Sequence, residues 1–108
     1  MESVEMIRAI IRPEKEKDVL KGLEDAGFIS VTKMHVFGRG KQKGIKVGEV
    51  VYDELPKLEL MMVVGKDDAE KVCDIIQEKA YTGNIGDGKI FVVPVSHVYT
   101  VRTGAEGL

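Results

Sequence analysis

The chain has little of several residues on which common folds and active sites depend. Its 108 residues include one cysteine, two histidines and no tryptophan, and only 6% of them are aromatic. A single cysteine excludes an internal disulfide, and two histidines cannot complete a four-ligand Cys/His zinc site with it. The aromatic residues are also too few for a sheet that stacks RNA bases. Disulfide scaffolds, zinc modules and aromatic RNA-binding platforms are therefore excluded.

Neither sign of charge dominates, since 16 Lys and Arg residues oppose 18 Asp and Glu residues and leave a net charge of −2. Generic nucleic-acid binding needs a basic excess, so we expect no nucleic-acid partner. No apolar run approaches the roughly 18 residues of a membrane span, and the N-terminus lacks a secretory pattern, so we expect a cytoplasmic protein without membrane insertion. The length and the 44% hydrophobic content predict one domain, residues 1–108, with its own core.

The sequence does contain a repeated pattern of strands and helices. Strand composition covers 4–12, 28–37, 58–64 and 90–95, with 98–101 as an optional short addition. Helical periodicity covers 14–26, which follows Pro13 and precedes Gly27, and 67–80, which Asp67 and Asp68 open. A Gly/Lys-rich stretch, 38–48, is not expected to hold a strand. A shift of about 53 residues superposes the two halves. It overlays Ile7, Ala9, Ile11, Val19 and Leu23 on Leu60, Met62, Val64, Val72 and Ile76.

Two β-α-β halves predict an α+β fold of the ferredoxin-like type, a four-stranded antiparallel sheet with both helices on one face. A long loop joins its second and third strands. The other face would carry Met6, Ile10, Met61 and Val63. Such a face is either covered by self-association, which we favour, or is an ordinary half-polar exposed face.

Two glycine-rich segments are candidates for anion binding. Gly83, four further residues, Gly88 and Lys89 have the spacing of a phosphate-binding loop, but Ile90 replaces the magnesium-binding Ser or Thr. This segment is either a backbone anion nest or an ordinary turn. The second segment, 38–46, places four cationic residues and three glycines inside a connection that spans about 20 residues. It is either a solubilising hairpin tip or a functional loop, and its length favours function.

No catalytic set can be assembled from the remaining reactive residues. His35 and His97 are interpreted as a strand-surface and a turn residue, and Cys73 as a small core residue of the second helix. No Ser/His/Asp arrangement follows from histidines so placed. The sequence therefore predicts a binding protein and not an enzyme.

Several motifs resemble those of the PII family of nitrogen signal-transduction proteins, over nearly the whole chain. They are Ile10-Ile-Arg-Pro13, Phe37-Gly-Arg39, Leu55-Pro-Lys57, Thr82-Gly-Asn-Ile-Gly-Asp-Gly-Lys-Ile-Phe91 and Arg102-Thr-Gly104. The resemblance implies a trimer with inward-facing sheets and nucleotide sites between subunits. It also implies that the long loop, 38–56, contacts target proteins.

The resemblance further implies ATP or ADP, Mg²⁺ and 2-oxoglutarate as effector ligands. Lys89 and Arg102 would hold ATP phosphates, Arg39 would close over the nucleotide, and Gln42 would bind Mg²⁺ together with oxygens of ATP and 2-oxoglutarate. The implied nucleotide-binding residues are Gly38, Arg39, Thr82, Gly83, Gly86, Asp87, Gly88, Lys89 and Arg102. The implied 2-oxoglutarate-binding residues are Gln42, Lys43, Gly44, Lys57 and Gly86.

The chain departs from the family pattern in three places. Gly40 and Lys41 widen the usual Gly-Arg-Gln-Lys-Gly run, which affects the assignment of Gln42. Thr100 stands where many members have another phosphate-binding arginine. Val50 and Glu49 stand at the positions of the uridylylated tyrosine and the phosphorylated serine, so we expect neither modification.

The segments 39–44, 48–56 and 80–84 are similar to the nitrogenase-linked branch of nitrogen-fixing archaea, and to the first of its two paired paralogues. This implies a homotrimer, or a hetero-oligomer with the paralogue, that binds nitrogenase when 2-oxoglutarate is low. An alternative target is an ammonium transporter. An alternative from another class is a small ferredoxin-like phosphate-handling enzyme such as an acylphosphatase, but the early arginine loop and the water-orienting asparagine it needs do not appear.

Overall fold

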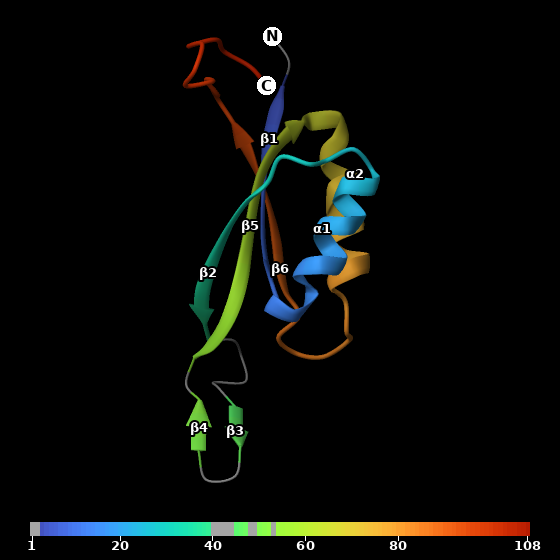
Figure 1. Ribbon diagram of the computed structural model, residues 1–108, viewed down its shortest axis with the longest axis vertical. Helices are drawn as coiled ribbons and strands as arrows, with labels where there is room; N and C mark the ends of the chain where they lie inside the picture. The colour runs from blue at the N-terminus through green and yellow to red at the C-terminus, as the bar shows by residue number, and fades with distance from the viewer. Residues whose placement is uncertain (1–2, 40–44, 48–49, 53) are drawn as a thin grey trace.

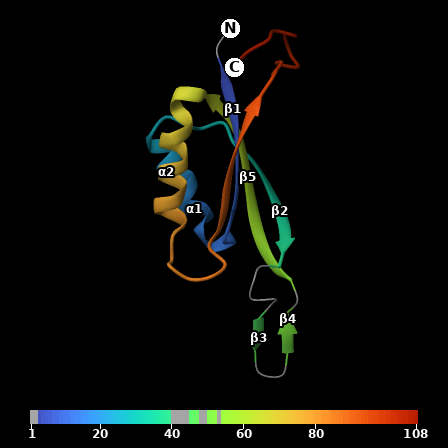
Figure 2. The same ribbon diagram turned by 180° about the vertical axis from the view of Figure 1, so that it is seen from behind.

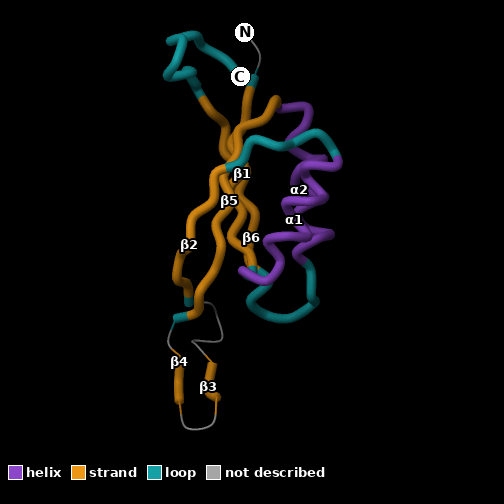
Figure 3. The backbone as a smooth tube through the Cα atoms, viewed as in Figure 1, coloured by secondary structure: helices purple, strands orange, loops and turns teal. Residues whose placement is uncertain are grey.

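The computed structural model describes residues 3–39, 45–47, 50–52 and 54–108. Figures 1 and 3 show the arrangement of its helices and strands. The strands are β1 (Val4–Ile11), β2 (Thr32–Gly38), β3 (Ile45–Val47), β4 (Val50–Tyr52), β5 (Leu55–Gly65) and β6 (Gly88–Val95). The helices are α1 (Glu16–Asp25) and α2 (Ala69–Ala80), each preceded by a short 3-10 turn, η1 (Pro13–Lys15) and η2 (Lys66–Asp68).

Four strands form one antiparallel sheet in the order β2-β5-β1-β6. In this register Ile10 of β1 lies between Glu59 of β5 and Lys89 of β6. Both helices lie on the same side of the sheet in the two opposite views of Figures 1 and 2. This confirms the ferredoxin-like arrangement predicted from the two halves. None of the described helices is long and apolar enough to cross a membrane.

The core lies between the helices and the sheet, and the internal repeat predicts it well. All ten residues that the shift of about 53 positions superposes are buried, with no more than 5% of any of them exposed. They alternate along β1 and β5 and recur at helical spacing along α1 and α2. Strand and helix periodicities therefore converge on one hydrophobic cluster.

The opposite face of the sheet carries the apolar residues expected there. Met6, Ile10, Met61 and Val63 are each only partly buried, and no described element lies over them. We call this surface the open face. It leaves more apolar area in water than a helix-covered face would, which is typical of an interaction surface.

The structure corrects several predicted boundaries. The stretch 38–48 does hold a strand, β3, which pairs with β4; Ile45 and Val47 are β-branched, which favours that pairing. β2 begins at Thr32 and not at 28, because 28–31 form the connection from α1. β5 begins at Leu55, three residues earlier than predicted. The optional short strand at 98–101 is wrong. The strand-like pairing in this segment is a single isolated bridge between Tyr99 and Glu106.

Candidate functional site

The loop between α2 and β6 is organised around the carboxylate of Asp87. Its Oδ2 accepts hydrogen bonds from the backbone N–H groups of Thr82 and Gly83, both at 2.9 Å. Its Oδ1 accepts from the Thr82 hydroxyl and from Nε of Arg12, the latter at 2.9 Å. Asp87 therefore occupies backbone donors that a phosphate nest would use, and it also ties the loop to the end of β1.

These donors hold the pKa of Asp87 well below its ordinary value of 3.8. The Thr82 hydroxyl has the largest effect, followed by the backbone N–H of Thr82, the Arg12 guanidinium and the N–H of Gly83. Each of these groups favours the ionised carboxylate. The arrangement of the loop consequently depends on a negative charge at Asp87.

We expect Asp87→Asn to weaken the acid dependence of stability. Because the folded pKa is depressed, the stabilisation from Asp87 is complete above its ordinary pKa near 3.8 and is lost as the pH falls below it. Melting temperatures measured from about pH 7 to about pH 2 should therefore fall less steeply below pH ~4 in the variant. Asp25→Asn, which removes an exposed partner of Lys21, is the control. Equal acid profiles for Asp87→Asn and the wild type would contradict the prediction.

Two cationic side chains meet at the backbone of this loop. Lys57 Nζ donates a hydrogen bond of 2.5 Å to the Gly86 carbonyl, and Arg12 Nη2 donates one of 3.0 Å to the Ile85 carbonyl. Burial lowers the pKa of Lys57, and the neighbouring Arg12 charge lowers it further. An anion placed against both side chains would relieve this repulsion.

Glycine is required at two positions of the site for different reasons. Gly86 has a φ of +105°, and a Cβ there would lie 3.2 Å from Arg12 Nη2 and 3.5 Å from Lys57 Nζ. Gly88 has a φ of +106°, and its Cβ would lie 1.7 Å from the Ile10 carbonyl oxygen. Gly86 therefore keeps space beside the two cations, whereas Gly88 allows β6 to approach β1.

The root of the long loop adjoins the same cations. Gly38 pairs with Leu55, so both ends of the 38–56 segment meet between β2 and β5. A Cβ on Gly38 would lie 3.7 Å from Lys57 Cγ. Arg39 follows and is exposed. Lys57 therefore lies between the loop root and Gly86.

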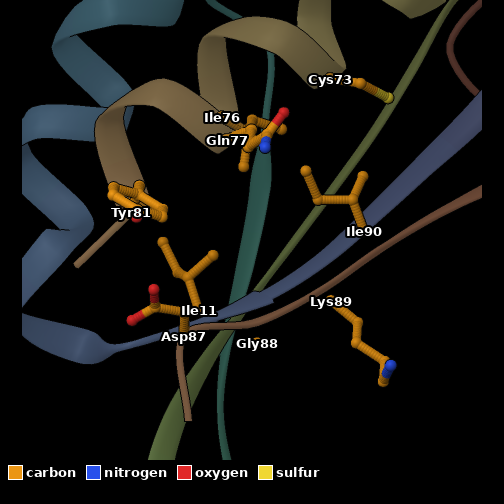
Figure 4. Close-up of a pocket in the computed structure, with 10 residues that line it drawn as sticks. Ile11, Cys73, Ile76, Gln77, Tyr81, Asp87, Gly88, Lys89 and Ile90 are labelled. Atoms are coloured by element: carbon orange, nitrogen blue, oxygen red, sulfur yellow. The ribbon is translucent and has the colours of Figure 1, made fainter. Parts of the chain in front are cut away.

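The two residues predicted to hold ATP phosphates lie far apart in one chain. Lys89 is the second residue of β6 and points away from Ile11 and Ile90 (Figure 4), toward the open face on which Ile10, its register partner, lies. Arg102 lies in the exposed C-terminal segment beyond the other end of β6 (Figure 1). A strand of this length separates them by roughly 20 Å or more. Lys89 and Arg102 of the same chain therefore do not lie at one site.

A pocket of about 330 Å³ lies between α2 and the start of β6. Ile11, Ile76 and Ile90 supply apolar walls, while Asp87 and Gln77 add polar groups (Figure 4). Cys73 also lines it, and burial raises the pKa of its thiol. Cys73 is thus partly buried beside a pocket and not fully enclosed in the core.

The structure brings together most of the predicted site residues and adds one. The 82–88 loop, which contains Gly86, lies next to Lys57 and Gly38. Three other predicted residues, Gln42, Lys43 and Gly44, lie outside the described residues. Arg12 was not among the predicted ligand-binding residues, although it contacts both Asp87 and Ile85. The sequence feature that could have identified Arg12 is its position in the Ile10-Ile-Arg-Pro13 motif, at the end of a strand. The described residues contain no group of acidic, His or Cys side chains that could hold a metal alone.

Comparisons with known proteins agree with this geometry. The family model for nitrogen regulatory protein P-II matches residues 4–105. The "Nitrogen fixation nifHD region GlnB-like protein 1" of Methanothermobacter marburgensis is 58% identical over 105 residues, covering 97% of this chain and 100% of that protein. Its counterpart from Methanococcus maripaludis is 55% identical with the same coverage. The crystal structure of Arabidopsis thaliana PII bound to citrate superposes with a TM-score of 0.82 and 40% identity, covering 98% of this chain and 90% of that one.

These matches confirm the resemblance inferred from the motifs, including the archaeal nitrogen-fixation branch and its first paralogue. Proteins of the matched family are signal transducers and not enzymes, as expected from the sequence. They form trimers, bind small effector ligands and regulate partner proteins. With a match that extends over almost its entire length, the chain belongs to the P-II family of nitrogen regulatory proteins.

Proposed function

We propose that this protein is a cytoplasmic sensor of nitrogen and energy status. It binds ATP or ADP and 2-oxoglutarate, and it regulates nitrogenase by direct contact through the 38–56 loop. The observation that carries the proposal is the convergence of Lys57 and Arg12 on the backbone of residues 85–86, next to the loop root. An anion bound at this point would contact both the candidate ligand site and the base of the loop.

The cation pair suits a dicarboxylate. Lys57 is partly buried beside a second positive charge, and Gly86 has no side chain to fill the space in front of it. Arg12 already donates to Asp87, which offsets part of its charge. Lys57 is therefore the cation best placed to bind a carboxylate of 2-oxoglutarate. The bound citrate of the Arabidopsis relative supports a carboxylate ligand for this family.

The nucleotide site requires a second copy of the chain. Lys89 lies at the start of β6 and Arg102 beyond its end, so an ATP held by both would lie between two subunits of a trimer. ATP, 2-oxoglutarate and one Mg²⁺ together carry a charge of about −4, which Arg39, Lys57, Lys89 and Arg102 would balance. Because the described residues hold no metal cluster of their own, Mg²⁺ would take its oxygen ligands from ATP, 2-oxoglutarate and Gln42.

We expect Lys89→Ala to weaken ATP binding by about 1.5–3 kcal/mol, the scale of a charge-assisted hydrogen bond to phosphate. Lys89 is exposed at the open face, so its removal should leave the fold intact. Calorimetric titration of ATP into wild type and variant measures the change. Lys79→Ala, an exposed lysine of α2, is the matched control. Unchanged ATP affinity in Lys89→Ala would remove Lys89 from the nucleotide site.

The names of the relatives favour nitrogenase over an ammonium transporter as the target. Several relatives with 50% or more identity, from different methanogens, are named for the nifHD region. The long loop joins the body at Gly38 and Leu55, next to Lys57. A ligand that displaces Lys57 from Gly86 would alter the loop at its base and change the surface presented to nitrogenase.

The proposal is tested by linked binding. We expect 2-oxoglutarate to bind measurably only when Mg-ATP is present, because a dianion beside a polyanionic nucleotide needs the shared metal. The coupling must be reciprocal, and about 1–3 kcal/mol corresponds to roughly 5- to 150-fold in affinity. Calorimetric titrations of each ligand, with and without the other and Mg²⁺, measure it. Equal 2-oxoglutarate affinity in the absence of Mg-ATP would contradict the proposed sensor.

A further inference from the structure

The open face contains one charged pair among apolar neighbours. Residues of alternate positions on β2, β5, β1 and β6 make up this face. Among them Met34, Phe91 and Val93 are 42%, 46% and 39% exposed. Glu59, in contrast, is only 6% exposed, although neither of the two described helices covers this side. It is the only buried charged residue in the described part of the chain.

Arg8 holds the Glu59 carboxylate through a single nitrogen. Arg8 Nη2 donates to both Oε1 and Oε2 of Glu59 at 2.9 Å. The Arg8 side chain is 44% exposed, and that of Glu59 is 7% exposed. An arginine has five N–H donors, and no described residue accepts from Nε or Nη1 of Arg8. The Glu59 charge is thus compensated within the chain, while the Arg8 side chain keeps free donors on the open face.

Covering the open face would bury those donors. Buried N–H groups of a guanidinium need acceptors, and leaving them without acceptors is costly. Members of the family form trimers, and an identical copy that covers the face presents the same set of side chains. Glu59 is the only carboxylate that the described residues of this face supply, so the charged acceptor available from a second copy is its Glu59.

We propose that Arg8 bridges two carboxylates, its own Glu59 and the Glu59 of an adjacent copy, and that this charge arrangement selects which chains assemble into one trimer. Each subunit boundary then joins an arginine of one chain to a glutamate of the next. A chain of the same fold without this pair would leave the free Arg8 donors of its neighbour without an acceptor in the boundary, which favours assembly of like chains. The proposal goes beyond ligand sensing and rests on the trimeric assembly of the family.

The test is subunit mixing measured by native mass spectrometry. Wild-type protein is exchanged at equal concentration with ¹⁵N-labelled Arg8→Glu/Glu59→Arg, a swap that restores the pair within each chain. Free mixing would place about three quarters of the trimers in mixed form. We expect mixed trimers to be depleted about tenfold or more, because each mixed boundary opposes like charges. Trimers of the swapped chain alone should persist.

A second variant covers the case in which the swapped chain does not fold. Arg8→Met/Glu59→Met replaces the pair by apolar side chains, a change that buried ion pairs often tolerate. Its mixed trimers with wild type should also be depleted, since each contains one boundary in which the free donors of a wild-type Arg8 have no acceptor. Lys21→Met/Asp25→Met, which removes an exposed pair of α1, should mix freely.

Free mixing of either Arg8/Glu59 variant with wild type would overturn the proposal and restrict the pair to a role within one chain. Linked binding of ATP and 2-oxoglutarate, measured on the same unmixed trimers, reports separately on the ligand site. Failure of boundary selection is therefore distinguishable from failure of the sensor function.

Discussion

Gly88→Ala is expected to leave the chain largely unfolded. A Cβ at this position would lie 1.7 Å from the carbonyl oxygen and 2.7 Å from the carbonyl carbon of Ile10. Both are backbone atoms of β1, a central strand of the sheet, so neither can move without disturbing the β1–β6 pairing. We expect a loss of more than about 4–5 kcal/mol, most of the stability of a small domain. Urea unfolding followed by circular dichroism measures it.

Gly27→Ala provides the matched control. Gly27 has a similar φ of +93°, but a Cβ there meets nothing within 4 Å. The control therefore measures the backbone cost of a positive φ alone, about 1–2 kcal/mol. If Gly88→Ala lost no more stability than Gly27→Ala, the close approach of β6 to β1 would not be what requires glycine at 88.

Lys57→Ala is expected to remove most of the affinity for 2-oxoglutarate and to leave ATP binding largely intact. The Lys57 ammonium is partly buried, faces the space in front of Gly86 and is assigned to the acid and not to the phosphates. Loss of a charge-assisted contact of this kind corresponds to about 1.5–3 kcal/mol, or roughly 10- to 150-fold. Titration of 2-oxoglutarate in the presence of saturating Mg-ATP measures it.

Lys66→Ala is the control for this variant, because Lys66 follows the opposite end of β5 and is exposed. It should change neither affinity. A proportional loss of ATP and 2-oxoglutarate affinity in Lys57→Ala would show that Lys57 holds the loop and not the acid. The Arg12 hydrogen bonds to Asp87 and Ile85 remain in the variant and keep the 82–88 loop attached to β1.

The fold could be predicted from the sequence because its core depends on short-range periodicity. Apolar residues at every second position of β1 and β5, and at helical spacing in α1 and α2, define the buried faces before any long-range contact is known. The ends of these elements depend on contacts that periodicity does not encode. Phe28, for example, has strand composition but packs against the core edge, with Lys71 Nζ 5.9 Å from the centre of its ring.

The C-terminal segment was mispredicted for a related reason. Residues 98–101 have strand composition, but the backbone turns back on itself here: the N–H of Thr100 donates to the Ala105 carbonyl, and that of Gly104 donates to the Thr100 carbonyl. The side chains of His97 and Glu106 add a contact of 3.0 Å across this turn. Two glycines with positive φ, Gly104 and Gly107, permit the turn.

The candidate site could be predicted only in part. Glycine spacing and the family motifs identified the 82–88 loop and Lys57, but they could not indicate that Asp87 takes up the backbone N–H groups of its own loop. The contribution of Arg12 depends on a partner 75 residues away. Such a contact follows from the strand order of the sheet and not from any local pattern.

The position of Lys57 also determines how much of the structure separates ligand binding from the loop response in the proposed sensor. Lys57 directly follows the 38–56 loop in the sequence, and its ammonium donates a hydrogen bond to the Gly86 carbonyl of the candidate ligand site. In the proposed sensor, ligand binding and the response of the loop would therefore share the Lys57 side chain. No rearrangement has to pass through the tightly packed layer between helices and sheet, which can stay rigid while the protein switches. Sequence changes that alter this layer should then affect how much folded protein is present, and leave the response of each folded molecule unchanged.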